Sequence, residues 1–185
     1  MGEIDDAIER ADREAFTRQP PKTLQARINF LMKQLKTTKA VAQEIGVSQR
    51  SVERYRKGER KHPPKAITDR IDDAVRARWQ PQVRKRRQKQ AAIATGITVE
   101  TRARFGYTAP VGTTDDGRFR RLTVHLPPVY AQRLFNARNT GASDQQMRAI
   151  IAEGFKEIYF QDGGTRATGL SDVTLNDIDY LDLDY

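Results

Sequence analysis

The segment "APVGTTDDGR", residues 109–118, carries the side chains whose chemistry is easiest to name. Two adjacent hydroxyls, Thr113 and Thr114, are followed directly by the carboxylates of Asp115 and Asp116. A threonine hydroxyl is a weak nucleophile unless another group activates it. The two metal ions of a polymerase can supply that activation, as they do for the 3′ hydroxyl of a primer. The chain would then need only to deliver an alcohol to another enzyme.

A local turn is the competing interpretation, because Thr and Asp side chains often cap neighbouring backbone N–H groups. The sequence lacks the residue patterns that other chemistries would need. The sequence has no Cys and two His, so a zinc site would need carboxylates at no recognisable spacing. A phosphate-binding loop of the Gly-x4-Gly-Lys-Ser/Thr type is absent. We therefore expect no catalytic residue and no metal site belonging to the chain itself.

The distribution of charge predicts a polyanionic partner. The net charge is +9, and residues 22–89 carry twenty basic against six acidic side chains, a local net charge of +14. Lys and Arg that neutralise phosphates release counterions, so such a segment favours nucleic-acid binding over a merely solvated surface. No run approaches the roughly 18 apolar residues of a membrane span, and the acidic N-terminus is unlike a secretory signal. We expect a cytoplasmic protein without membrane contact.

Residues 37–58, "TTKAVAQEIGVSQRSVERYRKG", resemble a DNA-binding helix-turn-helix. Gly46 provides the turn, Ser48 caps the second helix, and apolar residues fall on the inner faces. In such a motif the second helix enters the major groove, and its first outward residues, Gln49 and Arg50, reach base edges. Phosphate contacts are expected from three further residues: Arg54, Arg56 and Lys57. An ordinary helical hairpin with a basic surface is the alternative.

A second basic run, "RKRRQKQ", covers residues 84–90. We expect four of its side chains to follow DNA phosphates, namely Arg84, Lys85, Arg86 and Arg87. A solvated linker is the rival interpretation. Trp79, just before this run, could stack on bases, but its place on an apolar stripe favours a core position.

The second half of the chain alternates apolar and polar residues over 96–107 and 120–127, which predicts two strands. If the strands pair, residues 109–118 form the loop between them. Two helices follow. The run is compatible with a ribbon-helix-helix module, in which strands of two chains pair and present Arg121, Thr123 and His125 to DNA, or with a plain β-α-α domain. Either module would bury little apolar surface within a single chain, and this favours self-association.

These patterns predict a mainly α chain with a small β element, an α+β class. The expected divisions are a helical DNA-binding domain over 1–82, a basic linker or helix over 83–95, a strand-loop-strand-helix-helix module over 96–162, and an acidic tail over 163–185. The tail has five Asp after residue 170. It could be a final strand, a partner-binding segment or an arm that competes with DNA, and the sequence does not separate these.

The whole chain resembles the telomere terminal proteins of linear actinobacterial (Streptomyces-like) chromosomes and plasmids. The resemblance rests on "SQRSVERY", "RWQP", "VETRARFGYTAP" followed by "GTTDD", "RRLTV" with the following "LPP", and "DIDY". It implies a protein that is linked covalently to 5′ DNA ends and primes end-patching synthesis. The primer would be the second threonine of "GTTDD", Thr114, with Thr113 the less favoured neighbour.

The resemblance also implies partners and a location. They are telomeric DNA, both the single-stranded overhang and the duplex, a telomere-associated helicase-like recruiting protein, and DNA polymerase. The chain would be an acceptor substrate, not an enzyme, with Mg²⁺ and deoxynucleotide supplied through the polymerase. It would lie in the nucleoid at the ends of linear DNA. A dimeric helix-turn-helix transcriptional regulator is the alternative function.

Overall fold

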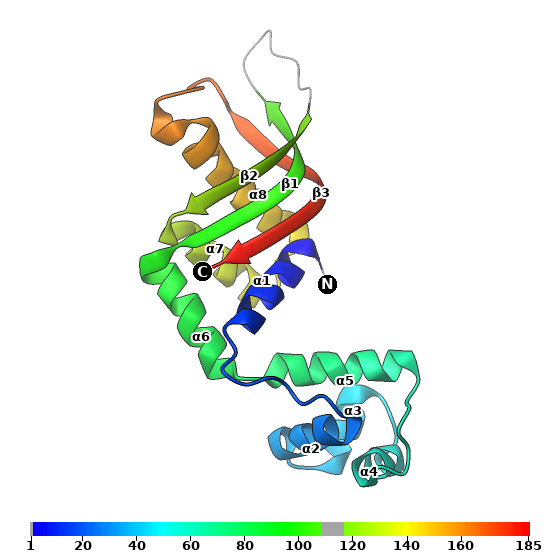
Figure 1. Cartoon of the computed structure of the whole chain (residues 1–185). Helices are drawn as coiled ribbons and strands as arrows, with labels where there is room; N and C mark the ends of the chain where they lie inside the picture. Colours follow the sequence, from blue (N-terminus) through cyan, green and yellow to red (C-terminus); the bar gives the residue numbers. More distant parts are fainter. Residues whose placement is uncertain (1, 109–116) are drawn as a thin grey trace. The chain divides into compact units, whose positions relative to one another are not determined.

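The computed structural model describes residues 2–108 and 117–185 and divides the chain into two units (Figure 1). One unit is Phe16–Pro81, and the other combines Met1–Ala15 with Gln82–Tyr185. Most elements are helices, and three strands form one antiparallel sheet. The predicted α+β class is confirmed.

The unit Phe16–Pro81 consists of four helices: α2 (Leu24–Leu35), α3 (Thr38–Ile45), α4 (Gln49–Lys57) and α5 (Lys65–Arg78). Its core takes side chains from every helix, among them Ile28, Leu31, Val41, Ile45, Val52, Tyr55, Ile71 and Val75. Trp79 packs edge-on against Phe30, with ring centroids 5.1 Å apart, and its Nε1 donates to the carbonyl of Arg18. Trp79 is half-buried and packs against Phe30, which borders the core of this unit, so it lies at the edge of the core and not within it as the sequence predicted.

Local sequence signals set the bounds of these helices. The hydroxyls of Thr23, Thr37 and Ser48 accept hydrogen bonds from Ala26 N, Ala40 N and Ser51 N, and so cap α2, α3 and α4. Gly46 ends α3 with a φ of 68°, a left-handed conformation that costs least without a Cβ. The three residues 46–48 therefore form a tight turn between α3 and α4, as the sequence predicted.

The second unit is built on a sheet of strand order β2-β1-β3. The strands are β1 (Ile97–Thr108), β2 (Arg118–Leu126) and β3 (Asp172–Asp184), and β1 pairs antiparallel with both neighbours. Along β1, side chains alternate between buried and more exposed from Ile97 to Phe105, and β2 alternates in the same way. The predicted pairing of the two strands and their predicted inward faces are confirmed.

Helices cover one face of this sheet: α1 (Glu3–Glu14), α7 (Pro128–Asn139) and α8 (Asp144–Phe155) (Figure 1). They share one core with the inward face of the strands. Helix α6 (Pro81–Gln90) continues into a short π-helix, η1 (Ala91–Thr95), before β1. A second π-helix, η2 (Lys156–Phe160), and a short 3-10 helix, η3 (Asp162–Gly164), follow α8.

The division into units differs from the predicted domain boundaries. Helix α1 packs with the sheet unit, although the sequence grouped it with the helix-turn-helix. The segment 83–95 belongs to the same sheet unit, and much of the acidic tail is β3. The reason is general: an amphipathic pattern identifies an apolar face but not the surface that covers it.

The ribbon-helix-helix interpretation also differs from the structure. Strand β2 pairs with β1 of its own chain over nine residue pairs, from Ile97↔Leu126 to Phe105↔Arg118. The strand-helix-helix run lies inside a three-stranded sheet domain, with β3 and α1 adding apolar side chains to its core. A single chain therefore buries a core of its own in this unit, and self-association stays a prediction.

Candidate nucleic-acid interface

Helix α4 presents the polar side chains that the sequence predicted would read DNA. Its inner face is fixed because Val52 and Tyr55 are buried in the unit core. That orientation leaves the predicted contact residues exposed, namely Gln49, Arg50, Arg54, Arg56 and Lys57. The Ser48 cap leaves Gln49 and Arg50 in the first turn of the helix, the end from which recognition helices reach base edges.

The basic side chains of α4 are weakly engaged within the unit. Arg54 Nε lies 3.8 Å from Glu59 Oε2, and both side chains are about half exposed, 52% and 51%. An exposed ion pair of this kind contributes little free energy, so a phosphate can compete for the guanidinium. The outward face of α4 can therefore carry both base-edge donors and phosphate contacts.

Helix α6 divides its basic run between two faces. Lys85, Arg86 and Lys89 lie on the solvent side of the helix, whereas Arg84 is buried. Arg84 Nη1 lies 2.7 Å from Glu9 Oε1 and 3.8 Å from Asp12 Oδ2. Arg84 is thus directed into the protein and away from any DNA surface, contrary to the sequence prediction.

Arg87 also turns inward, toward β3. Its Nη2 lies 2.9 Å from Asp184 Oδ1, its Nε donates to the Tyr185 carbonyl, and its guanidinium stacks over the Tyr185 ring at 5.3 Å. Helical spacing explains the division, since Arg84, Gln88 and Ala91 share a face that must pack on α1 and α7. Of the four predicted residues in this run, Lys85 and Arg86 are the two that α6 presents to solvent.

The buried charges around Arg84 form a network that joins α1, α6, α7 and Tyr185, the residue after β3. Arg138 donates to Asp5 and Glu9, and the Tyr185 hydroxyl donates to Asp12 at 2.7 Å. Burial raises the pKa of Glu9, but hydrogen bonds from Arg84 and Arg138 and their charges outweigh it and leave that pKa below its ordinary value. Burial dominates at Asp12 and raises the pKa of that carboxyl. These paired charges hold the elements of the sheet unit together.

The two threonines of the central motif, Thr113 and Thr114, lie outside the described residues, as do Asp115 and Asp116. The strands on either side are described. Their last register pair before the segment is Phe105↔Arg118, and Arg104 Nε donates to the Gly117 carbonyl at 3.1 Å. The predicted priming segment therefore joins the paired ends of β1 and β2.

An aromatic cluster that the sequence did not predict lies beneath this end of the sheet. Phe160, the last residue of the π-helix after α8, packs against Tyr107 and Phe105 with ring centroids 5.2 Å and 5.7 Å apart. The Arg120 guanidinium stacks over both Tyr107 and Phe160, at 5.9 Å from each ring. The cluster fixes the strand ends that border the segment 109–116. Only the run of aromatic residues in 155–160 could have indicated it.

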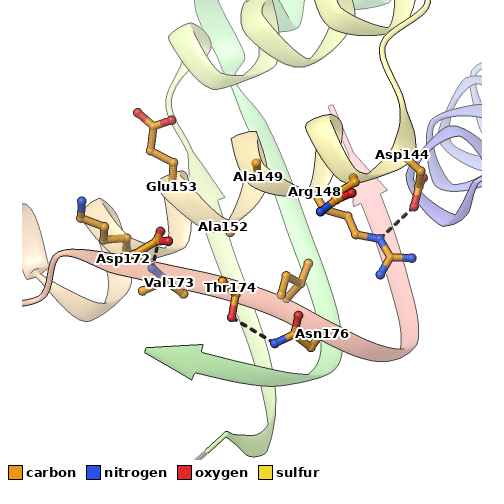
Figure 2. Close-up of a pocket in the computed structure, with 12 residues that line it drawn as sticks. Asp144, Arg148, Ala149, Ala152, Glu153, Asp172, Val173, Thr174 and Asn176 are labelled. Atoms are coloured by element: carbon orange, nitrogen blue, oxygen red, sulfur yellow. Dashed lines mark hydrogen bonds and ion pairs between the residues drawn. The ribbon is translucent and has the colours of Figure 1, made fainter. Parts of the chain in front are cut away.

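A cavity of about 790 Å³ lies between α8 and the start of β3 (Figure 2). Its charged residues already pair with one another or with neighbours: Arg148 contacts Asp144 at 2.8 Å, and Glu153 is paired with Arg133. Across the described residues no group of three or more His, Cys, Asp or Glu side chains could hold a metal ion. The cavity therefore offers no assembled reactive group.

Comparison with protein-family models, curated proteins and solved structures finds no match to this chain. Among the helices of the described residues, none has both the length and the apolar character needed to cross a bilayer.

Proposed function

We propose that this chain is a terminal protein that primes DNA synthesis at the ends of a linear replicon. The observation that carries the proposal is the central motif, "VETRARFGYTAP" followed by "GTTDD", which resembles that family's priming region in sequence. The motif covers most of β1 and nearly all of the segment between β1 and β2. An alcohol between two paired strand ends suits delivery to another protein's active site.

The chemistry of the proposed step is a nucleotidyl transfer. The Oγ of Thr114 attacks the α-phosphate of a deoxynucleoside triphosphate, a Thr-Oγ–P bond forms, and the bond to pyrophosphate breaks. Pyrophosphate leaves, and the hydroxyl proton passes to a base or water in the polymerase site. The polymerase's Mg²⁺ ions activate the hydroxyl and the leaving group. This chain supplies the nucleophile and is the acceptor substrate.

DNA binding would hold the chain at the telomere during that step. The exposed residues of α4 are suited to duplex contacts, and Lys85 and Arg86 of α6 add positive charge. We expect the telomeric duplex and its single-stranded overhang, DNA polymerase and a helicase-like recruiting protein as partners. The place of action would be the nucleoid, at the DNA ends.

A deoxynucleotidylation assay tests the proposal. The chain is incubated with DNA polymerase, the recruiting protein, telomeric single strand, Mg²⁺ and labelled deoxynucleotides, and label on the protein is measured after denaturation. Thr114→Ala should abolish labelling, whereas Thr113→Ala should retain it. Both variants should bind telomeric duplex as the wild type does. An unlabelled wild-type chain in this complete mixture would defeat the proposal.

Two other functions predict different results. A helix-turn-helix regulator, which the exposed face of α4 would serve equally well, predicts that the wild-type chain stays unlabelled in this assay. A protein that caps DNA ends without a covalent bond predicts that heat and denaturant strip it from them. A phosphodiester linkage would survive both treatments.

A further inference from the structure

The outward face of the sheet brings arginines together near the end where β1 and β2 border the segment 109–116. Arg102 of β1 lies directly opposite Arg121 of β2, and Arg104 lies opposite Phe119. We call these four residues the hairpin arginine patch. All four are exposed, whereas helices of the same unit cover the opposite face of the sheet (Figure 1).

Placing two arginines directly opposite one another weakens a sheet, because like charges at opposed positions repel. Nearby carboxylates pair with these arginines, but the ion pairs are exposed to solvent. Arg102 pairs with Asp179, and Arg121 Nη2 lies 2.6 Å from Glu100 Oε1, yet the Arg121 side chain remains 72% exposed. Arg104 Nη1 is 3.7 Å from Asp177 Oδ2. Exposed pairs of this kind hold a guanidinium in place weakly, so a phosphate can replace the carboxylate.

Phe119 gives the patch a second property. Its side chain is 51% exposed on an otherwise polar face, and the Arg102 guanidinium stacks over its ring at 5.6 Å. Aromatic side chains on sheets bind unpaired bases by stacking, with arginines following the backbone. A base in a duplex is already stacked on both sides, so this arrangement suits a single strand.

We propose that the hairpin arginine patch binds single-stranded DNA, with a base stacked on Phe119 and phosphates on Arg102, Arg104 and Arg121. The inference rests on the proposed priming function, because it would hold the template overhang beside the residues that carry the primer hydroxyl. It assigns the single strand to the outward face of the sheet and leaves the duplex to α4 and the solvent side of α6. The two DNA forms are then bound by different surfaces.

Fluorescence anisotropy with a labelled oligothymidylate of about 16 nucleotides tests the inference without polymerase. The full chain carrying Thr114→Ala is the background, so covalent attachment cannot contribute. Phe119→Ala should weaken single-strand binding about tenfold, and Phe119→Trp should restore it. Val129→Ala, at a 52% exposed apolar residue on α7, is the matched control and should change nothing.

The arginines are tested through salt dependence. Arg121→Gln should reduce the magnitude of the slope of log K against log salt concentration by about 0.7, the value for one phosphate of a single strand. Arg133→Gln removes another ion-paired surface arginine, on α7, and should leave the slope unchanged. Asp179→Asn should strengthen binding, because it removes a carboxylate that competes with phosphate for Arg102.

Binding to a matched duplex separates this inference from the proposed function. The patch variants should leave duplex affinity unchanged, whereas Arg54→Ala in α4 should lower it. Unchanged oligothymidylate binding in Phe119→Ala and Arg121→Gln would overturn the inference, as would an equal reduction on the duplex. Because the assay contains no polymerase or nucleotide, a failure of Thr114 to accept nucleotide would leave its result standing.

Discussion

Arg84 and Glu9 form an ion pair of 2.7 Å inside the sheet unit, where their side chains are only 11% and 9% exposed. The pair joins α6 to α1, two helices that are far apart in the sequence. Arg138 of α7 shares the same Glu9 oxygen, at 2.6 Å. Two guanidinium groups on one carboxylate anchor three helices at one point, so the basic run of α6 has a structural as well as an electrostatic role.

The first prediction contrasts the two faces of α6. Arg84→Ala should lower the free energy of unfolding by about 3 kcal/mol, because it leaves Glu9 and Asp12 buried with less compensation. Arg86→Ala, on the solvent side, should change stability by less than about 0.5 kcal/mol. Urea denaturation followed by circular dichroism measures both. Comparable stability of the two variants would show that the Arg84 pair is not formed in solution.

Duplex binding should depend on the solvent-facing residues of α6 and not on Arg84. Lys85→Ala and Arg86→Ala should weaken duplex binding and reduce its salt dependence, by about 0.9 in slope for every phosphate that the variant no longer neutralises. Arg84→Ala, tested under conditions where it remains folded, should have the wild-type slope. A reduced slope in folded Arg84→Ala would return that residue to the DNA interface.

The pKa shift of Glu9 predicts a pH dependence with a defined sign. Its pKa is lowered in the folded protein, so its ionised form favours folding at pH values above its ordinary value of 4.5. That stabilisation is lost as the pH falls below 4.5 toward the lowered value. Asp12 has the opposite sign, since a raised pKa favours folding when the carboxyl is protonated.

Glu9→Gln should therefore be most destabilising near neutral pH, and the difference from wild type should shrink as the pH falls below about 4.5. Urea denaturation at several pH values between neutral and about pH 3.5 gives this difference. Glu3→Gln, at an exposed acidic residue of the same helix, is the control. A stability difference that stays constant over the whole range would contradict the role assigned to the Glu9 carboxylate.

The exposed face of α4 predicts two kinds of effect on duplex binding. Gln49→Ala and Arg50→Ala should reduce the preference for telomeric over unrelated duplex, each by about 1–3 kcal/mol, because they remove base-edge contacts. Lys57→Ala should weaken binding to both duplexes equally and lower the salt slope. Competition binding with the two duplexes measures both quantities. A uniform reduction in all three variants would mean that α4 contacts only the backbone.

Local patterns predicted much of this structure, because local physics fixes it. The Ser48 cap and the Gly46 turn set α3 and α4, and the alternation around Val99 and Val124 set the paired strands. Contacts between residues far apart in the sequence were not predicted. Nothing near Arg84 in the sequence indicates Glu9, because their pairing depends on α1 packing against the sheet unit rather than against the helices that follow it. For the same reason, the sequence did not predict that Phe160 packs beneath the ends of β1 and β2.

The last prediction concerns the bond to DNA. A phosphodiester on threonine is released by alkali through β-elimination, whereas one on tyrosine persists. Tyr107 is the tyrosine nearest to Thr114 in sequence, but its ring is packed against Phe160 and beneath Arg120. Its hydroxyl would have to leave that cluster to act as the nucleophile. We therefore expect alkali to free the protein from labelled DNA ends, and mass spectrometry of nuclease-trimmed ends to find the nucleotide on residue 114. An alkali-resistant linkage, or an adduct on Tyr107, would move the priming chemistry from the segment to the strand beside it.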